Sequence, residues 1–237
     1  MTGNLLDGWR EEQFGRSRDG IPLRVFLPSG DGPIAGLVTA AQHGEEAHTA
    51  LLARRLLERV SARETRWAVV PCLNPDGVLN GTRQNAAGVD LNRNFPAASW
   101  RADVSVTYPP GIADELRVSA NRTNRSSPGP EPGSEPETRA QMALVERLAP
   151  ALVVDLHSPL ELILDRGSAP PEVVSRLAAS AGLAVERELD GPCPGAFDDW
   201  LTERGVPALV YEIEHAGLPA LCARHLPGLE ALLRESS

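Results

Sequence analysis

The stretch Ile34-Ala-Gly-Leu-Val-Thr-Ala-Ala41, followed by Gln42 and the turn His43-Gly44-Glu45-Glu46, decides the fold. Residues 34–41 form an apolar run of strand length, which predicts a buried strand. Leucines at helical spacing follow in Thr49–Ala62 and predict a helix. A buried strand that leads into a helix is the repeating unit of α/β proteins.

The same alternation continues along the chain. Further strands are predicted at Trp67–Leu73, Ala151–His157, Leu160–Leu164 and Ala208–Ile213, and further helices at Thr138–Ala149, Pro171–Ala181, Ala196–Arg204 and Pro219–Arg234. The helix at 138–149 follows Ser134-x-x-Glu137, a capping-box pattern, with Pro136 in the first turn. Because the strand runs are continuously apolar, we predict an α/β fold whose parallel or mixed sheet is covered on both faces.

We see no internal repeat or domain linker, so residues 1–237 are predicted to form a single catalytic domain. One segment breaks the alternation. Residues 101–137 are rich in Pro, Gly, Ser, Asn and Arg, which predicts a long loop that is either a functional lid or partly disordered.

Composition excludes several classes of protein. The net charge of −9 argues against binding to nucleic acid. No run approaches the ~20 apolar residues of a membrane span, and residues 1–17 lack the apolar core of a secretory signal. The three cysteines have no metal-type spacing and do not imply disulfides. We therefore expect a cytoplasmic protein with neither a nucleic-acid nor a membrane partner.

Three residues form a candidate metal site. His43 and Glu46 are placed in the turn after the first strand, and His157 ends another. The carboxyl ends of neighbouring strands meet at one edge of an α/β sheet, where such proteins place their sites. Two histidines and one carboxylate, with a vacant fourth position, suit a catalytic zinc. We predict one zinc ion per chain.

A carboxylate on a later strand is the candidate general base. Water activated by zinc needs a group that takes its proton and passes it to the leaving nitrogen. Tyr211-Glu212-Ile213-Glu214 offers two acids, two positions apart, near the end of a strand. We favour Glu212, because its apolar neighbours indicate that it points into the protein, and we interpret Glu214 as a solvated strand end.

The loop around residues 83–95 supplies candidate cations. A guanidinium stabilises a developing oxyanion or binds a carboxylate through two parallel hydrogen bonds. Arg83 and Arg93 are candidates for these roles, and Asn92 next to Arg93 would complete a clamp for a carboxylate. Asp90 could orient a metal-bound histidine by accepting its second N–H.

These residues resemble a known family. The matching segments are Phe14-Gly15-Arg16-Ser17, His43-x-x-Glu46, Asn74-Pro75-Asp76-Gly77, Arg83, Gly88-Val89-Asp90-Leu91-Asn92-Arg93-Asn94-Phe95, His157-Ser158 and Glu212. In this order they resemble the zinc metallocarboxypeptidases of the carboxypeptidase A type, from about Phe14 to Glu212. Within the family the likeness is greatest to the short bacterial members that act on cell-wall (murein) peptides.

The resemblance implies a single-domain α/β/α sandwich around a mixed, mainly parallel sheet. It implies that zinc is bound by His43, Glu46 and His157, and that Glu212 is the general base. Arg83 would polarise the scissile carbonyl. Asn92 and Arg93 would hold the carboxylate of the released residue. The implied reaction is hydrolysis of the γ-D-glutamyl–meso-diaminopimelate bond in the tripeptide L-alanyl-γ-D-glutamyl-meso-diaminopimelate.

Other activities use the same residues. A carboxypeptidase on other peptides, or an N-acyl-amino-acid deacylase, needs the same metal, base and clamp. A non-catalytic muropeptide-binding protein is disfavoured, because every catalytic position is filled. Relatives often carry a Tyr shortly before the Pro-Gly that matches Pro194-Gly195, whereas this chain has Asp190-Gly191-Pro192 there. Tyr108 is the candidate to replace that Tyr. For Asp198 and Asp199 we favour a helix-dipole role over contact with the substrate.

Overall fold

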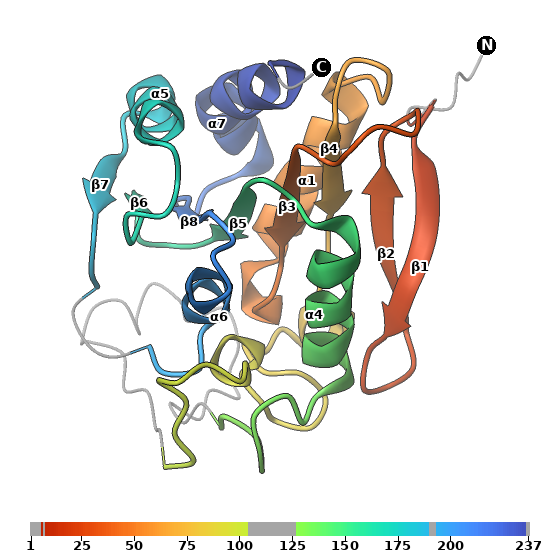
Figure 1. Ribbon diagram of the computed structural model, residues 1–237, viewed down its shortest axis with the longest axis vertical. Coiled ribbons are helices and arrows are strands. Elements are labelled where there is room, and N and C mark those ends of the chain that lie inside the picture. The colour runs from red at the N-terminus through yellow and green to blue at the C-terminus, as the bar shows by residue number, and fades with distance from the viewer. Residues whose placement is uncertain (1–5, 7, 104–126, 190–192, 236–237) are drawn as a thin grey trace.

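The computed structural model describes residues 6, 8–103, 127–189 and 193–235. In this part of the chain eight strands form one sheet (Figure 1). They are β1 (Arg10–Arg16), β2 (Pro22–Leu27), β3 (Gly36–Ala40), β4 (Trp67–Val70), β5 (Val153–His157), β6 (Leu162–Leu164), β7 (Ala184–Glu186) and β8 (Ala208–Glu212). Their order is β1-β2-β4-β3-β5-β8-β6-β7. The central strands β4, β3, β5 and β8 are parallel, while β1, β2 and β6 make antiparallel pairs.

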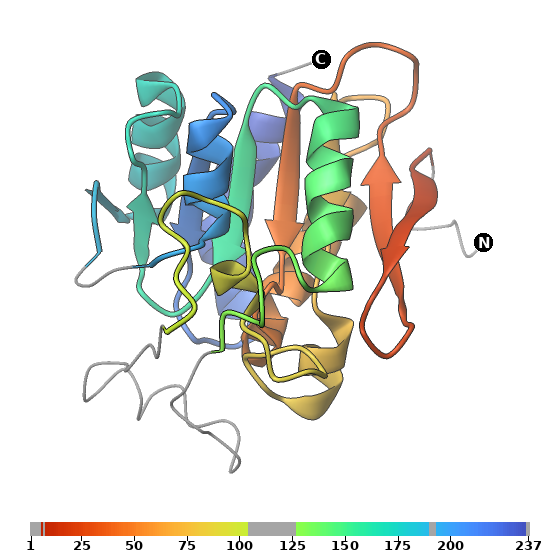
Figure 2. The ribbon, with the colours of Figure 1, turned by 60° about the horizontal axis from the view of Figure 1, so that its bottom comes forward.

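Helices cover both faces of this sheet. The described helices are α1 (Ala47–Arg59), α2 (Pro75–Asn80), α4 (Pro136–Leu148), α5 (Pro171–Ala181), α6 (Phe197–Glu203) and α7 (Leu218–Arg234), with short 3-10 turns η1 (Gly44–Glu46) and η2 (Leu91–Arg93). Figure 2 shows the green helix α4 in front of the sheet, and the orange α1 and the blue-to-purple α7 behind it. The predicted α/β/α sandwich with a mixed, mainly parallel centre is therefore confirmed.

Each face has its own core. Leu52 and Leu56 of α1 pack with Leu177 of α5 and Leu229 of α7 on one face. On the other face, Leu144 of α4 packs with an aromatic group from α6 and its neighbourhood, which consists of Phe95, Phe197 and Trp200. Burial of the central strands on both sides explains their continuous apolar runs.

Several elements differ from the prediction. The hairpin β1–β2 was not expected, because β1 is a polar edge strand with little apolar signal. The capping box at Ser134 is wrong: α4 begins at Pro136 with Glu135 as its N-cap and no side-chain cap. The Ser134 hydroxyl instead donates to the Glu135 carboxylate at 2.8 Å. The predicted loop therefore ends before Pro136. Its residues 104–126, and Tyr108 with them, lie outside the described residues.

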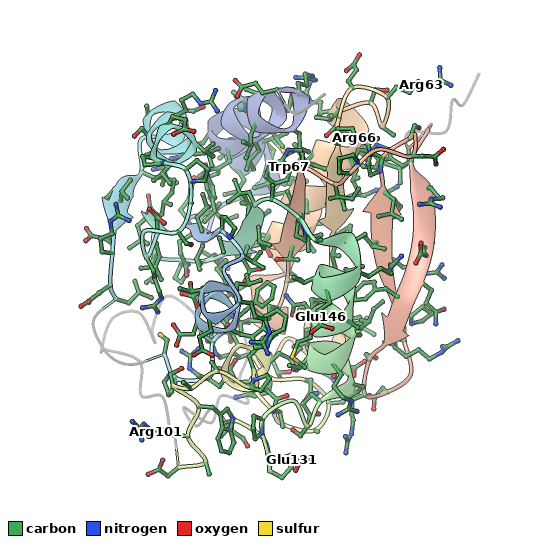
Figure 3. The ribbon with its side chains drawn as sticks, viewed as in Figure 1. Arg63, Arg66, Trp67, Arg101, Glu131 and Glu146 are labelled. Carbon is green, nitrogen blue, oxygen red and sulfur yellow. The ribbon has the colours of Figure 1, made fainter. Side chains whose placement is uncertain are left out.

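The carboxyl ends of the parallel strands bring the candidate residues to one edge. His43 follows β3, His157 ends β5 and Glu212 ends β8. In Figure 3, Trp67, which begins β4, and Arg66 just before it lie at one end of the molecule, and Arg101 and Glu131 lie at the other. None of the described helices is both long and apolar enough to cross a membrane.

Candidate metal centre and active site

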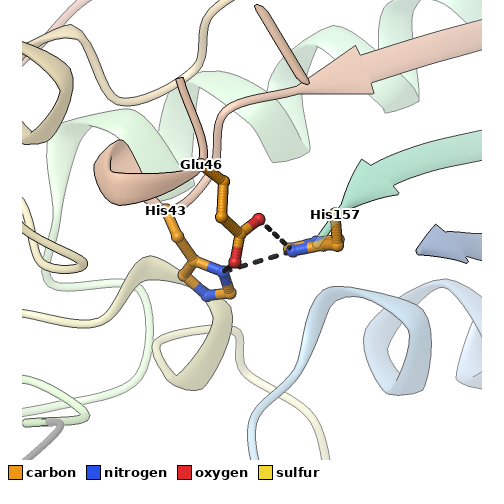
Figure 4. Close-up of side chains that lie close together, drawn as sticks. All are labelled: His43, Glu46 and His157. Atoms are coloured by element: carbon orange, nitrogen blue, oxygen red, sulfur yellow. Dashed lines mark hydrogen bonds and ion pairs between the residues drawn. The ribbon is translucent and has the colours of Figure 1, made fainter. Parts of the chain in front are cut away.

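Three buried side chains converge at this edge (Figure 4). The Nδ1 atom of His43 lies 2.7 Å from one oxygen of Glu46, and the Nδ1 atom of His157 lies 3.1 Å from the other. The two Nδ1 atoms are 3.2 Å apart. Each residue is about 2% exposed, so the three form a buried cluster of two imidazoles and one carboxylate.

The outer edges of both imidazoles test whether this set fits a zinc ion. Nε2 of His43 lies 3.2 Å from Asp90, and Nε2 of His157 lies 2.9 Å from Asp155. A carboxylate accepts an N–H there, so each ring in its neutral form would carry its proton on Nε2 and present a bare Nδ1 to a bound metal. Two bare nitrogens that face one carboxylate are what a zinc site of this type requires. The residues therefore fit the metal.

The pKa shifts of Glu46 and His157 also favour a bound cation. Burial alone would raise the pKa of Glu46, but the neighbouring His43 and His157 outweigh it and hold that pKa below its usual range. Burial alone would lower the pKa of His157, whereas Asp155 and Glu46 raise it well above the ordinary value. Without a cation the cluster thus favours an ionised carboxylate beside a protonated imidazole. A bound metal ion would supply that positive charge in place of the proton.

Asp155 is a site residue that the sequence reasoning missed. It precedes His157 by two positions on β5, so both side chains lie on the same face of the strand. Its other oxygen accepts a hydrogen bond from Thr39 of β3 at 2.5 Å. An aspartate in an otherwise apolar run, two residues before a candidate ligand, was the available signal.

The turn that carries His43 and Glu46 is held by close backbone packing. A Cβ atom on Gly44 would lie 1.9 Å from the carbonyl carbon of Gly77 in α2. Asn74, the N-cap of α2, donates to the carbonyls of Gln42 and Arg83 and accepts from Gly77 N. The segment Asn74-Pro75-Asp76-Gly77 therefore starts a helix and fixes the turn that carries His43 and Glu46.

Gly44→Ala tests this close approach. We expect the free energy of unfolding to fall by about 3 kcal/mol, because the added methyl overlaps backbone that cannot move aside. Chemical denaturation of the metal-free protein measures the change. Gly217→Ala is the matched control, since its new Cβ would find only one atom, 3.9 Å away. Equal stability of both variants would contradict the account.

Arg83 lies beside the metal cluster. Its Nε donates to Asp90 at 2.7 Å, and its Nη1 lies 3.8 Å from an oxygen of Glu46. The side chain is 10% exposed. Asp90 thus holds both His43 and Arg83. Burial alone would raise the pKa of Asp90, but Arg83 and His43 hold it well below its usual range, so the residue stays ionised.

Asp90→Asn is expected to weaken both contacts while keeping the shape of the side chain. An amide cannot hold the histidine and the guanidinium by charge, so we expect zinc affinity or kcat to fall by about 10- to 100-fold. Competition with a chelator measures the affinity and steady-state kinetics the turnover. If neither quantity changed, Asp90 would have no orienting role.

Asn92 and Arg93 lie together in η2. The Asn92 side-chain oxygen accepts from Phe197 N at 2.8 Å, which turns its amide nitrogen away from α6. Arg93 is 4% exposed, and its Nε has no partner among the described residues. A buried guanidinium with an open donor is suited to an anion that is not part of the chain. We call these two residues the carboxylate clamp.

Glu212 completes the set. It pairs with His157 across the β5–β8 ladder and is 7% exposed. One carboxylate oxygen accepts from Leu160 N at 3.3 Å. Burial raises the pKa of Glu212 to about 7. A carboxylate with that pKa is poised to accept and return a proton near neutral pH. Glu214, two residues further on, is not simply solvated but contacts His225 and Arg224.

The other histidines and the two acids of α6 lie outside the cluster. His225 is fully buried and contacts Tyr211 and Glu214, so it has a packing role. His48 packs edge-on against the exposed His215. Asp198 and Asp199 stand in the first turn of α6, where both lie close to Arg166, and Asp199 also accepts from Ser99.

Comparison with known proteins agrees with this geometry. The model of the zinc carboxypeptidase family matches residues 10–178. Murein peptide amidase A of Escherichia coli (strain K12) is 34% identical over 94% of this chain and 89% of its own. Murein peptide amidase A of Vibrio campbellii is 30% identical over 93% of this chain and 86% of its own. The crystal structure of murein-tripeptide amidase MpaA from Escherichia coli O157 covers 94% of this chain and 91% of its own, with a TM-score of 0.84 and 32% identity. Thrombin activatable fibrinolysis inhibitor, 17% identical with a TM-score of 0.76, shares the fold.

Proposed function

The chain belongs to the zinc carboxypeptidase family of hydrolases, and we propose that it cleaves the γ-D-glutamyl–meso-diaminopimelate bond of a murein tripeptide. The observation that carries the proposal is the carboxylate clamp beside the metal cluster. It suits a substrate whose scissile amide lies next to a free carboxylate. The murein substrate is supported by relatives that match nearly the whole chain and are named for murein peptides.

His43, Glu46 and His157 would hold the metal. Zinc held by these residues would act as a Lewis acid for the amide carbonyl and for a water molecule. Asp90 and Asp155 keep both imidazoles in the tautomer that binds the metal. These roles follow from the buried contacts and from the chemistry of the donor set.

Asn92 and Arg93 would orient the substrate by its terminal carboxylate. Arg83, held by Asp90, would stabilise the negative charge that develops on the carbonyl oxygen, an effect of roughly 3–4 kcal/mol for one well-placed donor. Glu212 would take a proton from the attacking water and return it to the nitrogen of the leaving diaminopimelate. Burial keeps the pKa of Glu212 near the value that this exchange needs.

The reaction would be carried by one domain acting on a small peptide in the cytoplasm. The described elements share one sheet, which supports a single domain. The three cysteines are free, which fits a reducing compartment.

The test incubates zinc-loaded protein with L-alanyl-γ-D-glutamyl-meso-diaminopimelate and measures free diaminopimelate by mass spectrometry. A second tripeptide, amidated at the carboxylate next to the scissile bond, is the matched substrate control. We expect release from the acid and at least about tenfold slower release from the amide, because a charged hydrogen-bond partner is lost. No release from either, with zinc bound, would reject this substrate. Equal rates of release from the acid and from the amide would show that Asn92 and Arg93 do not bind this carboxylate.

A further inference from the structure

A cysteine lies against the carboxylate clamp. The Sγ atom of Cys193 is 3.5 Å from Nη2 of Arg93. The residue is partly buried and forms no disulfide. Two residues further on, Gly195 approaches Arg93 so closely that a Cβ would lie 2.6 Å from the arginine carbonyl. The backbone that follows the cysteine therefore packs closely against the clamp.

The open edge of Arg93 faces the same place. Nη1 donates to the Asn92 carbonyl at 2.6 Å, Nη2 contacts the sulfur, and Nε has no partner in the described part of the chain. Nε and Nη2 form the edge of a guanidinium that binds a carboxylate through two parallel hydrogen bonds. A carboxylate bound there would therefore lie next to Cys193.

A second guanidinium is close to the sulfur. Burial alone would lower the pKa of Arg166, but Asp198, Asp199 and Cys193 together raise it, so the thiol is within electrostatic reach of this cation. The thiolate form of a cysteine is the nucleophile in disulfide exchange.

We propose that Cys193 is a modification site for small disulfides that carry a carboxylate, and that the mixed disulfide closes the carboxylate clamp. The Cys193 thiolate attacks one sulfur of the reagent and forms a new S–S bond. The old S–S bond breaks, and the other half leaves as a thiolate. The cysteine is oxidised, the reagent is reduced, and a reductant reverses the step. The role of the clamp in turnover rests on the proposed function.

The other two cysteines differ in their surroundings. Burial raises the pKa of Cys72 to about 12, which keeps it protonated at neutral pH. Cys222 lies in α7 and packs against the apolar core of that face. Cys193 is the one that contacts a residue of the clamp, so modification at the three sites can be told apart.

The experiment treats the zinc-loaded full chain with 5,5′-dithiobis(2-nitrobenzoate), which carries carboxylates, and with neutral 2,2′-dithiodipyridine. Peptide mass spectrometry gives the labelling rate at each cysteine, and the zinc content is followed throughout. Cys193→Ser and Cys222→Ser are treated in parallel, and Arg93→Gln tests the origin of the charge preference. A phosphine reductant then reverses the label.

We expect the anionic reagent to label Cys193 faster than the neutral one, relative to Cys222, and Arg93→Gln to remove this preference. Free meso-diaminopimelate should slow labelling. After treatment with the reagent, wild type and Cys222→Ser should show a KM for the tripeptide at least about tenfold above that of the untreated protein, with zinc retained. The same treatment should leave the KM of Cys193→Ser unchanged.

Two results would overturn the proposal: full labelling of Cys193 with KM unchanged, or a charge preference that survives in Arg93→Gln. Labelling rates do not depend on turnover. A protein that fails to cleave the tripeptide would therefore reject the proposed function alone, and the labelling comparison would still decide the role of Cys193.

Discussion

Glu212→Gln is expected to reduce turnover by about 10²- to 10⁴-fold, the contribution of a positioned general base. The amide keeps the size of the side chain but cannot accept and return a proton. In the described part of the chain the Glu212 carboxylate accepts a hydrogen bond from Leu160 N and forms none with the three candidate metal ligands. Zinc content should therefore not change.

Steady-state kinetics with the murein tripeptide and elemental analysis of the purified variant measure both quantities. Glu214→Gln is the matched control, since it makes the same chemical change two residues away, where the carboxylate contacts His225 and Arg224. Retention of most of the activity by Glu212→Gln would remove this residue from its proposed role. An equal loss in Glu214→Gln would indicate structural damage.

His43→Ala is expected to abolish both zinc binding and activity. Removing one of three protein ligands leaves two, and it also leaves Glu46 without the imidazole that lies 2.7 Å from its carboxylate. A catalytic zinc is normally held by three protein ligands, so the remaining pair should not retain the metal through purification. Thermal unfolding with and without a chelator should differ in wild type and coincide in the variant, because a ligand that binds only the folded state stabilises it.

His215→Ala serves as the control, because its ring is exposed and packs against His48 rather than the cluster. It should keep one zinc and its activity. A His43→Ala protein that retained zinc at the wild-type level would show that the metal is held elsewhere.

Most of the site follows from the sequence because each residue stands at the end of a buried strand. His43 comes just after β3, while His157 and Glu212 end β5 and β8. Apolar runs of this kind locate strand ends well, and parallel strands bring those ends to one edge. Two histidines and one carboxylate, His43, Glu46 and His157, then predict a catalytic zinc site.

The contacts that could not be predicted from the sequence depend on the order of the strands in the sheet and on the paths of the loops. Asp155 is held by Thr39, a contact that exists only because β3 and β5 are neighbours in the sheet. Cys193 meets Arg93 across 100 positions of sequence through an irregular segment with no periodic pattern. The helix at Asn74 was missed because a six-residue helix that begins with Asn-Pro has the composition of a turn.

The most direct test is a crystal structure of zinc-loaded Glu212→Gln with the murein tripeptide, with anomalous diffraction measured at the zinc edge. The account predicts one zinc peak about 2.0–2.2 Å from His43 Nδ1, His157 Nδ1 and a Glu46 oxygen. The carboxylate next to the scissile amide should lie on Asn92 and Arg93. Zinc bound at other residues, or a tripeptide whose carboxylate lies away from the clamp, would contradict it.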